Sequence, residues 1–202
     1  MVAMAGPNLI LRGRSDALLV LGLLASDRRD RTGFGDALPI RLIMGGLRPG
    51  TTKPLDEAGK RSIREHWEHV HEASGQPFNM RFFNRTGFIY HTEPASKAVV
   101  FARRSGMEQS LAYLPLVQRA FYAENRDVTN EEVLADLAIK AGLDGQAFLK
   151  VFRRDHVKQE TWTDFAIAQR AGITGFPTLV AEADKRPEYG IIRQGGTVNL
   201  LD

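Results

Sequence analysis

The feature that most constrains the fold is a block of helical patterns enclosed between two strand patterns. Apolar residues recur at helical spacing in six segments, and Thr92-Glu93-Pro94 has the composition of a capped helix start. A branched apolar run, Pro39–Met44, precedes the block and predicts a strand, while Gly172–Val180 and Tyr189–Arg193 after it predict an antiparallel hairpin. This order indicates an α/β protein with a largely helical middle. The helical segments are Leu55–Ser74, Thr92–Gly106, Met107–Tyr122, Thr129–Ala141, Asp144–Phe152 and Gln159–Ala171.

The entry to the hairpin is the most informative short motif, Gly175-Phe176-Pro177-Thr178. A proline cannot donate a ladder hydrogen bond, so Pro177 belongs at the first position or the edge of a strand. Composition alone indicates no more than a strand-entry proline, because cis bonds are uncommon even before proline. The succession of helix, Gly-Ile-Thr-Gly-Phe-Pro-Thr, apolar strand, turn and second strand resembles the cis-proline loop of thioredoxin folds.

The resemblance covers about residues 39 to 195 and rests on several longer strings. These strings are GGLRPGT (45–51), GQPFNMRFF (75–83), TEPASKAVVFAR (92–103), QRAFYAENRDVTN (118–130) and TWTDFAIAQRAGITGFPTLV (161–180). Together they resemble a branch of the DsbA family that is described as predicted protein-disulfide isomerases. The resemblance implies a thioredoxin fold with a helical domain inserted between the second and third strands. It places the amino-terminal part of the thioredoxin-like domain at residues 1–50, the inserted domain at 51–160 and the carboxyl-terminal part at 161–202.

The same resemblance implies a substrate site and a catalytic motif. Gly175, Phe176, Pro177 and Thr178 are expected to bind an extended peptide or protein thiol substrate, with the bond before Pro177 in the cis form. The family's CxxC pair directly follows the central first strand and faces this loop, because a thiolate at a helix start attacks the disulfide and a second thiol resolves the mixed disulfide.

The chain departs from the family at this point because it contains no cysteine. Thiol nucleophiles, disulfides, zinc–thiolate sites and iron–sulfur clusters are therefore impossible in it. We predict a chain without catalytic residues, cofactor or metal, in which thiol–disulfide exchange is absent.

The segment that should hold the first strand, the CxxC motif and the first helix is residues 1–35, which show no family pattern. If the codons for Leu18–Leu23 are shifted by one nucleotide, they can encode Ser-Trp-Cys-Trp-Gly-Phe, which resembles a family active site. Ala17 alone cannot yield the first cysteine. Our hypothesis is that residues 9–32 are a frame-shifted translation. Leu9-Ile10-Leu11 is expected to be too short to replace the first strand, which predicts marginal stability, poor amino-terminal order and a tendency to associate.

The apolar run Ala17–Ala25 is too short to span a membrane. Arg12 and Arg14 before it leave a signal peptide over residues 1–26 as an alternative, although bulky Leu23 stands where a small residue is preferred. Because this cleavage region does not fit a signal peptide well, we expect a cytoplasmic protein. The 27 basic and 24 acidic side chains are mixed along the chain, which gives no support to a nucleic-acid or membrane partner.

Other candidate sites and functions are weaker. His66 and His69 share a helix face near several glutamates, but this spacing is more typical of a solvated polar face than of a metal site. One functional alternative is a glutathione-dependent enzyme that resembles the hydroxychromene-carboxylate isomerases and kappa-class transferases. That activity requires a serine at the start of the first helix, and neither Ser15 nor Ser26 lies in a convincing strand-to-helix turn. A non-catalytic peptide-binding scaffold is the other alternative.

Overall fold

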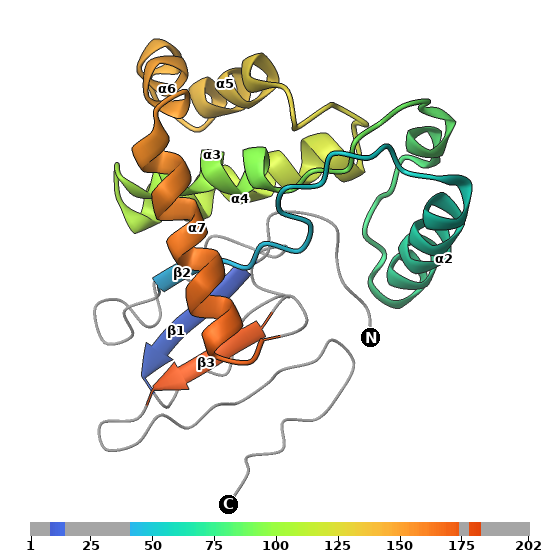
Figure 1. Ribbon diagram of the computed structural model, residues 1–202, viewed down its shortest axis with the longest axis horizontal. Coiled ribbons are helices and arrows are strands. Elements are labelled where there is room, and N and C mark those ends of the chain that lie inside the picture. Colours follow the sequence, from blue (N-terminus) through green and yellow to red (C-terminus); the bar gives the residue numbers. More distant parts are fainter. Residues whose placement is uncertain (1–8, 15–40, 174–177, 183–202) are drawn as a thin grey trace, which may run out of the picture.

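The computed structural model describes residues 9–14, 41–173 and 178–182, and it contains a small sheet beneath a group of helices (Figure 1). The helix α7 descends from the helical group and crosses the sheet, while α2 lies to one side. The described elements are β1 (Leu9–Arg14), β2 (Arg41–Met44), α2 (Glu57–Ser74), the 3-10 helix η3 (Met80–Asn84), α3 (Glu93–Arg103), α4 (Met107–Tyr122), α5 (Glu131–Lys140), α6 (Gly145–Phe152), α7 (Asp155–Arg170) and β3 (Thr178–Glu182).

Local sequence signals set several helix ends. The side chains of Asp56, Asn130 and Asp144 cap α2, α5 and α6 by accepting backbone N–H groups of the first turn. Gly75 ends α2 in the left-handed conformation, with φ of 69°, and its N–H donates to the His71 carbonyl. The predicted helices are confirmed, and α4 has the predicted bounds.

The predicted cap of α3 is wrong in its detail. Thr92 precedes the helix, and Pro94 lies in the first turn as expected, but the Thr92 side chain makes no capping hydrogen bond. Its Oγ1 instead accepts the backbone N–H of Arg48 at 3.0 Å. The hydroxyl therefore binds the loop that follows β2 rather than its own helix.

The three described strands form one sheet in the order β2-β1-β3, so β1 is central. The expectation that Leu9–Leu11 is too short to form this strand is wrong, because β1 extends through Arg14. It pairs with β2 in the antiparallel and with β3 in the parallel direction. The three residues that interrupt the apolar pattern still supply backbone hydrogen-bonding groups, which do not depend on the side chain.

The two faces of β2 pack against different groups of side chains. Leu42 and Met44 are fully buried in the larger core, which the helices supply. Ile43 points to the other face and packs in a small second cluster with Ala168 of α7. This alternation buries both sides of β2, as is usual for a strand with helices on both faces.

An aromatic cluster around Trp67 forms one end of the larger core. Trp67 of α2 is 1% exposed and contacts five other rings at centroid separations of 5.0 to 5.9 Å. Tilted and edge-on pairs of this kind stabilise a core beyond the area that they bury. The five rings are those of Phe78, Phe82, Phe83, Phe121 and Tyr122.

Several sequence-based expectations fall outside the described residues. The second hairpin strand, Tyr189–Arg193, and most of the proposed frame-shifted segment are among them. The division into three parts remains a prediction, and α7 continues without a break across the expected boundary after residue 160.

The chain's two tryptophans provide a matched test of this packing. We expect Trp67→Ala to lower the free energy of unfolding by about 3–5 kcal/mol, because it leaves a large cavity among packed rings. Trp162→Ala should cost about 1 kcal/mol, since Trp162 is 42% exposed and contacts the Phe165 ring at its edge. Urea unfolding followed by circular dichroism measures both. Equal losses would contradict the central role of Trp67.

Candidate functional site

The candidate site lies at the end of the sheet where β2 ends and β3 begins. Leu9 pairs with Met44 of β2, and Ile10 pairs with Thr178 of β3, so these residues mark one end of the sheet. We call it the Thr178 end. Of the four predicted substrate-binding residues, Thr178 begins β3, whereas Gly175, Phe176 and Pro177, with the predicted cis bond, lie outside the described residues.

The direction of β1 contradicts the expected arrangement of the catalytic motif and the proline loop. For the residues after β1 to face the loop before Thr178, β1 would have to run antiparallel to β3. The two strands are parallel instead, and the last residue of β1, Arg14, pairs with Glu182. Arg14 is four positions beyond Ile10, which corresponds to about 13 Å along the strand. The chain therefore leaves β1 at the end of the sheet opposite Thr178.

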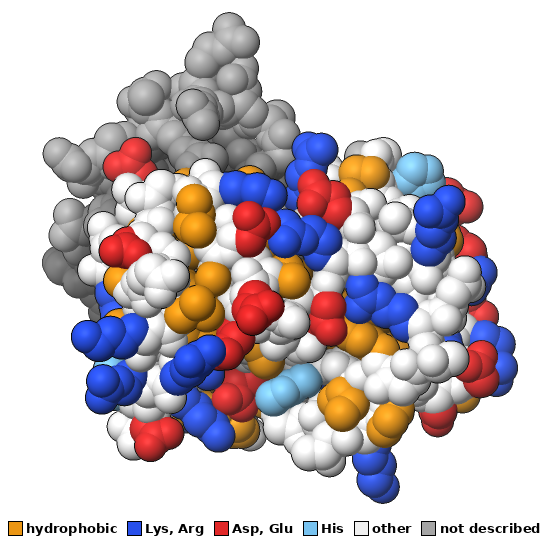
Figure 2. Space-filling view, turned by 90° about the horizontal axis from the view of Figure 1, so that it is seen from above, with side chains coloured by type: hydrophobic (Ala, Val, Ile, Leu, Met, Phe, Trp, Pro, Cys, Tyr) orange, Lys and Arg blue, Asp and Glu red, His pale blue; other side chains and the backbone are white. Residues whose placement is uncertain are grey.

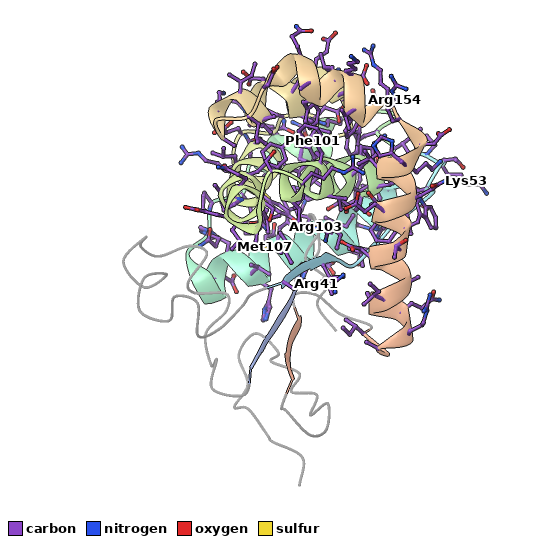
Figure 3. All side chains as sticks on the ribbon, turned by 90° about the vertical axis from the view of Figure 1, so that its left-hand side faces the viewer. Arg41, Lys53, Phe101, Arg103, Met107 and Arg154 are labelled. Carbon is purple, nitrogen blue, oxygen red and sulfur yellow. The ribbon has the colours of Figure 1, made fainter. Side chains whose placement is uncertain are left out.

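Side chains from three helices occupy the outer edge of β2, and Figure 3 shows Arg103 and Met107 where the helices approach this strand. The Leu42 carbonyl accepts a hydrogen bond from Arg103 Nη1 at 2.7 Å. The Leu42 N–H donates to Met107 Sδ at 3.3 Å, and the Met44 N–H donates to Asp164 Oδ2 at 3.0 Å. Unpaired edge groups promote association with other strands, and here side chains bind three of them.

The edge contacts depend on a buried ion pair between α3 and α7. Arg103 Nη1 and Nη2 donate to the two oxygens of Asp164 at 2.7 and 3.2 Å. The Asp164 side chain is 3% exposed and that of Arg103 is 15% exposed. A bidentate pair with further backbone partners is the geometry in which burial of two charges is tolerated.

Sequence reasoning did not assign a role to this pair. Both residues lie in strings that carry the family resemblance. The sequence pattern of α7 could have indicated that Asp164 is buried. Asp164 occurs on the same helix face as the buried Thr161 and Ala168. A carboxylate on a buried face requires a partner of opposite charge or a hydrogen-bond donor. The sequence could indicate this requirement but not which residue meets it.

The loop at 45–54 leaves the Thr178 end and packs closely against α7. Gly46 has φ of 66°, and a Cβ at this position would lie 2.6 Å from Cγ of Phe165. Only glycine fits both the conformation and the contact. Further along the loop, Arg48 donates its N–H to Thr92 Oγ1, and the Thr92 N–H donates to the Arg48 carbonyl at 3.4 Å.

Burial shifts the pKa values of several titratable groups in the described residues. No group of three or more histidines, aspartates or glutamates in the described ranges is arranged to hold a metal ion. Burial raises the pKa values of the Tyr90, Tyr113 and Tyr122 phenols, which keeps them neutral. Burial also lowers the pKa of His66, with a smaller contribution from His69.

Comparison with known proteins identifies the family. The family described as Thioredoxin matches residues 65–197, which is more than half of the chain. The chain belongs to the thioredoxin family. A solved structure titled "Crystal structure of a putative protein disulfide isomerase from Nitrosomonas europaea" has 30% sequence identity and a TM-score of 0.73, with 94% of this chain and 91% of that chain covered. The expected DsbA-like thioredoxin fold with a helical insertion is therefore confirmed.

Two structures of one further thioredoxin-fold protein share the fold. The cytosolic disulfide reductase DsbM from Pseudomonas aeruginosa is 24% identical, with a TM-score of 0.60 over 96% of this chain and 89% of that chain. Its structure with GSH gives 24% identity and a TM-score of 0.59, with 96% and 90% coverage. In the part of the chain that the structure describes, no helix has the length and apolar character needed to cross a membrane.

The ion pair at the β2 edge is open to direct test. We expect Asp164→Asn to lower the free energy of unfolding by about 3 kcal/mol, because the variant leaves the buried Arg103 charge without its carboxylate. Glu124→Gln is the control, since its partner Arg119 is largely exposed, and its effect should be below about 0.5 kcal/mol. Urea unfolding of both variants measures the difference, and similar losses would show that Asp164 does not stabilise the sheet edge.

Proposed function

We propose that this protein is a thioredoxin-family binding protein that holds extended polypeptide at the Thr178 end and carries out no thiol–disulfide exchange. One observation carries the proposal: the thioredoxin family matches residues 65–197, yet the chain has no cysteine. Disulfide exchange proceeds through a thiolate and a mixed disulfide, and no other side chain can substitute for the sulfur. The names of the similar proteins, a protein disulfide isomerase and a disulfide reductase, support descent from enzymes that act on polypeptide disulfides.

Binding without catalysis is consistent with the described geometry. The backbone beside Pro177 is the expected partner of an extended chain, and backbone pairing of this kind does not depend on a nucleophile. Gly46 brings the loop at 45–54 against Phe165, so this border of the Thr178 end is closely packed. A fixed border of this kind favours binding because little conformational entropy is lost when the ligand docks.

A glutathione-dependent activity is less well supported. A similar fold has been solved with GSH, and the required nucleophile here would be a serine after the first strand. Ser15 directly follows β1, but β1 ends beside Glu182 and not beside Thr178. The strand before Ser15 thus ends away from Thr178, and Ser15 and Ser26 themselves lie outside the described residues.

We also propose a cytoplasmic location. The support comes from the P. aeruginosa DsbM, which is described as cytosolic. The interpretation of residues 1–26 as a signal peptide remains the alternative.

The proposed function makes two predictions, that an unfolded chain binds at the Thr178 end and that disulfide reduction is not catalysed. We expect reduced, carboxymethylated ribonuclease A, an unfolded chain without free thiols, to shift backbone amide resonances of Gly46, Leu47, Ile173 and Thr178. Resonances of α5 and α6 should not move. In an insulin-reduction assay with dithiothreitol, the same sample should match the rate without protein.

A pair of variants provides the control. Phe176→Pro, which removes a backbone N–H beside Pro177, should weaken the binding several-fold, whereas Ile139→Ala should leave it unchanged, because Ile139 is 61% exposed on α5. Catalysed insulin reduction would refute the loss of redox chemistry. Shifts confined to α5 and α6, or equal affinities of the two variants, would refute the binding site.

A further inference from the structure

The Nε2 atom of His91 has two neighbours that require opposite protonation states. The backbone N–H of Gly50 donates a hydrogen bond to it at 3.1 Å, which requires an unprotonated nitrogen. A carboxylate oxygen of Glu93, Oε2, lies 3.5 Å from the same atom, and this contact is an ion pair only when the ring is charged. One nitrogen cannot satisfy both partners at once.

The contact with Gly50 belongs to a set of hydrogen bonds that dock the loop at 45–54 onto the start of α3. Two others join Arg48 to Thr92 through backbone and hydroxyl groups, and Thr51 Oγ1 donates to the Arg48 carbonyl at 3.2 Å within the loop. Neither backbone amides nor threonine hydroxyls change charge near neutral pH. Histidine side chains do so between about pH 5 and pH 8, so His91 is the acceptor in this set that responds to protons.

We propose that His91 is a proton-operated latch for the loop at 45–54. When the ring is neutral, its Nε2 lone pair accepts the Gly50 N–H and the loop is fastened at this point. When the ring binds a proton, Nε2 becomes a donor, turns toward the Glu93 carboxylate and releases Gly50. The fastened state is therefore present at higher pH and is lost as the pH falls.

The residues around His91 can accommodate both the neutral and the protonated ring. The Glu93 side chain is 10% exposed, so its carboxylate is a sheltered partner for a charged imidazole, while the His91 side chain is 27% exposed and open to solvent protons. Lys97, one turn along α3 from Glu93, adds a positive charge, and its pKa is lowered mainly by burial and raised in part by Glu93. In the loop, the Arg48 guanidinium lies over the Tyr90 ring, 5.4 Å from its centroid.

The latch borders the Thr178 end, although it does not depend on peptide binding there. The loop begins directly after Met44, at the point where β2 reaches that end of the sheet. Release of Gly50 removes one of the bonds that hold the middle of the loop, while Gly46 remains packed on Phe165. Acidification would thus loosen the far part of the loop and leave its base in place.

Nuclear magnetic resonance of the full chain between pH 8 and pH 5 tests the latch. At pH 8, we expect the ¹⁵N shift of His91 Nε2 to be that of an unprotonated ring nitrogen. As the ring takes up a proton, the Gly50 amide should shift along the same titration curve and exchange with solvent about fivefold faster after correction for intrinsic rates, which corresponds to the loss of one ordinary hydrogen bond.

Two variants separate the latch from general effects of acid. His91→Gln can accept the Gly50 N–H through its amide oxygen and cannot titrate, so the Gly50 amide should become insensitive to pH. His69→Gln, which removes an exposed histidine on α2, should leave the Gly50 titration unchanged. A proton on Nε2 at pH 8, or a Gly50 amide that does not follow the His91 ring in the unaltered protein, overturns the proposal even if no variant folds.

Discussion

The junction between the sheet and the helices depends on the Arg103–Asp164 pair. Burial of two opposite charges is costly unless each has further hydrogen-bonding partners. Here the backbone of β2 supplies them, because the Leu42 carbonyl binds the guanidinium and the Met44 N–H binds the carboxylate. The pair joins α3, α7 and β2 through directional bonds. It fixes the orientation of these three elements, which apolar contacts alone would define less sharply.

Local structure was predictable wherever the signal lies in neighbouring residues. Helical periodicity defined α4 from Met107 to Tyr122, and Gly75 marked the end of α2. The partner of Asp164 could not be predicted, since Arg103 is 61 residues away along the chain. Thr92 had the composition of a cap, but the loop before α2 competes for its hydroxyl. Where a side chain has two possible hydrogen-bonding partners, the tertiary structure determines which one it binds.

The direction of β1 was also beyond the reach of sequence patterns. Alternation of side chains is the same whether a strand is followed forward or backward, and backbone groups can pair in either direction. The position of the strand in the centre of the sheet was expected from the family, but the residues that form it were not. Of the candidate site, Thr178 is at the start of β3 as expected. The neighbouring strand β1, however, runs parallel to β3 rather than antiparallel to it.

Loss of sulfur chemistry and retention of the fold are compatible for a physical reason. The larger core is formed mainly by the helices α2 to α7 and by β2, and the aromatic cluster around Trp67 joins α2, η3, α4 and Phe78 of the loop before η3. None of these contacts requires a residue that takes part in disulfide exchange. A family member can therefore lose its reactive residues and keep the packing that defines its architecture.

The closed outer edge of β2 affects how molecules of this protein can assemble. A fibre built by edge-to-edge strand pairing needs two open edges on every subunit, one for the molecule before it and one for the molecule after it. In the described sheet, side chains of α3, α4 and α7 bind the outward backbone groups of Leu42 and Met44. Of the two edges of the described sheet, the β2 edge is therefore unavailable for such pairing. A filament that needs both edges of this sheet in every molecule cannot form.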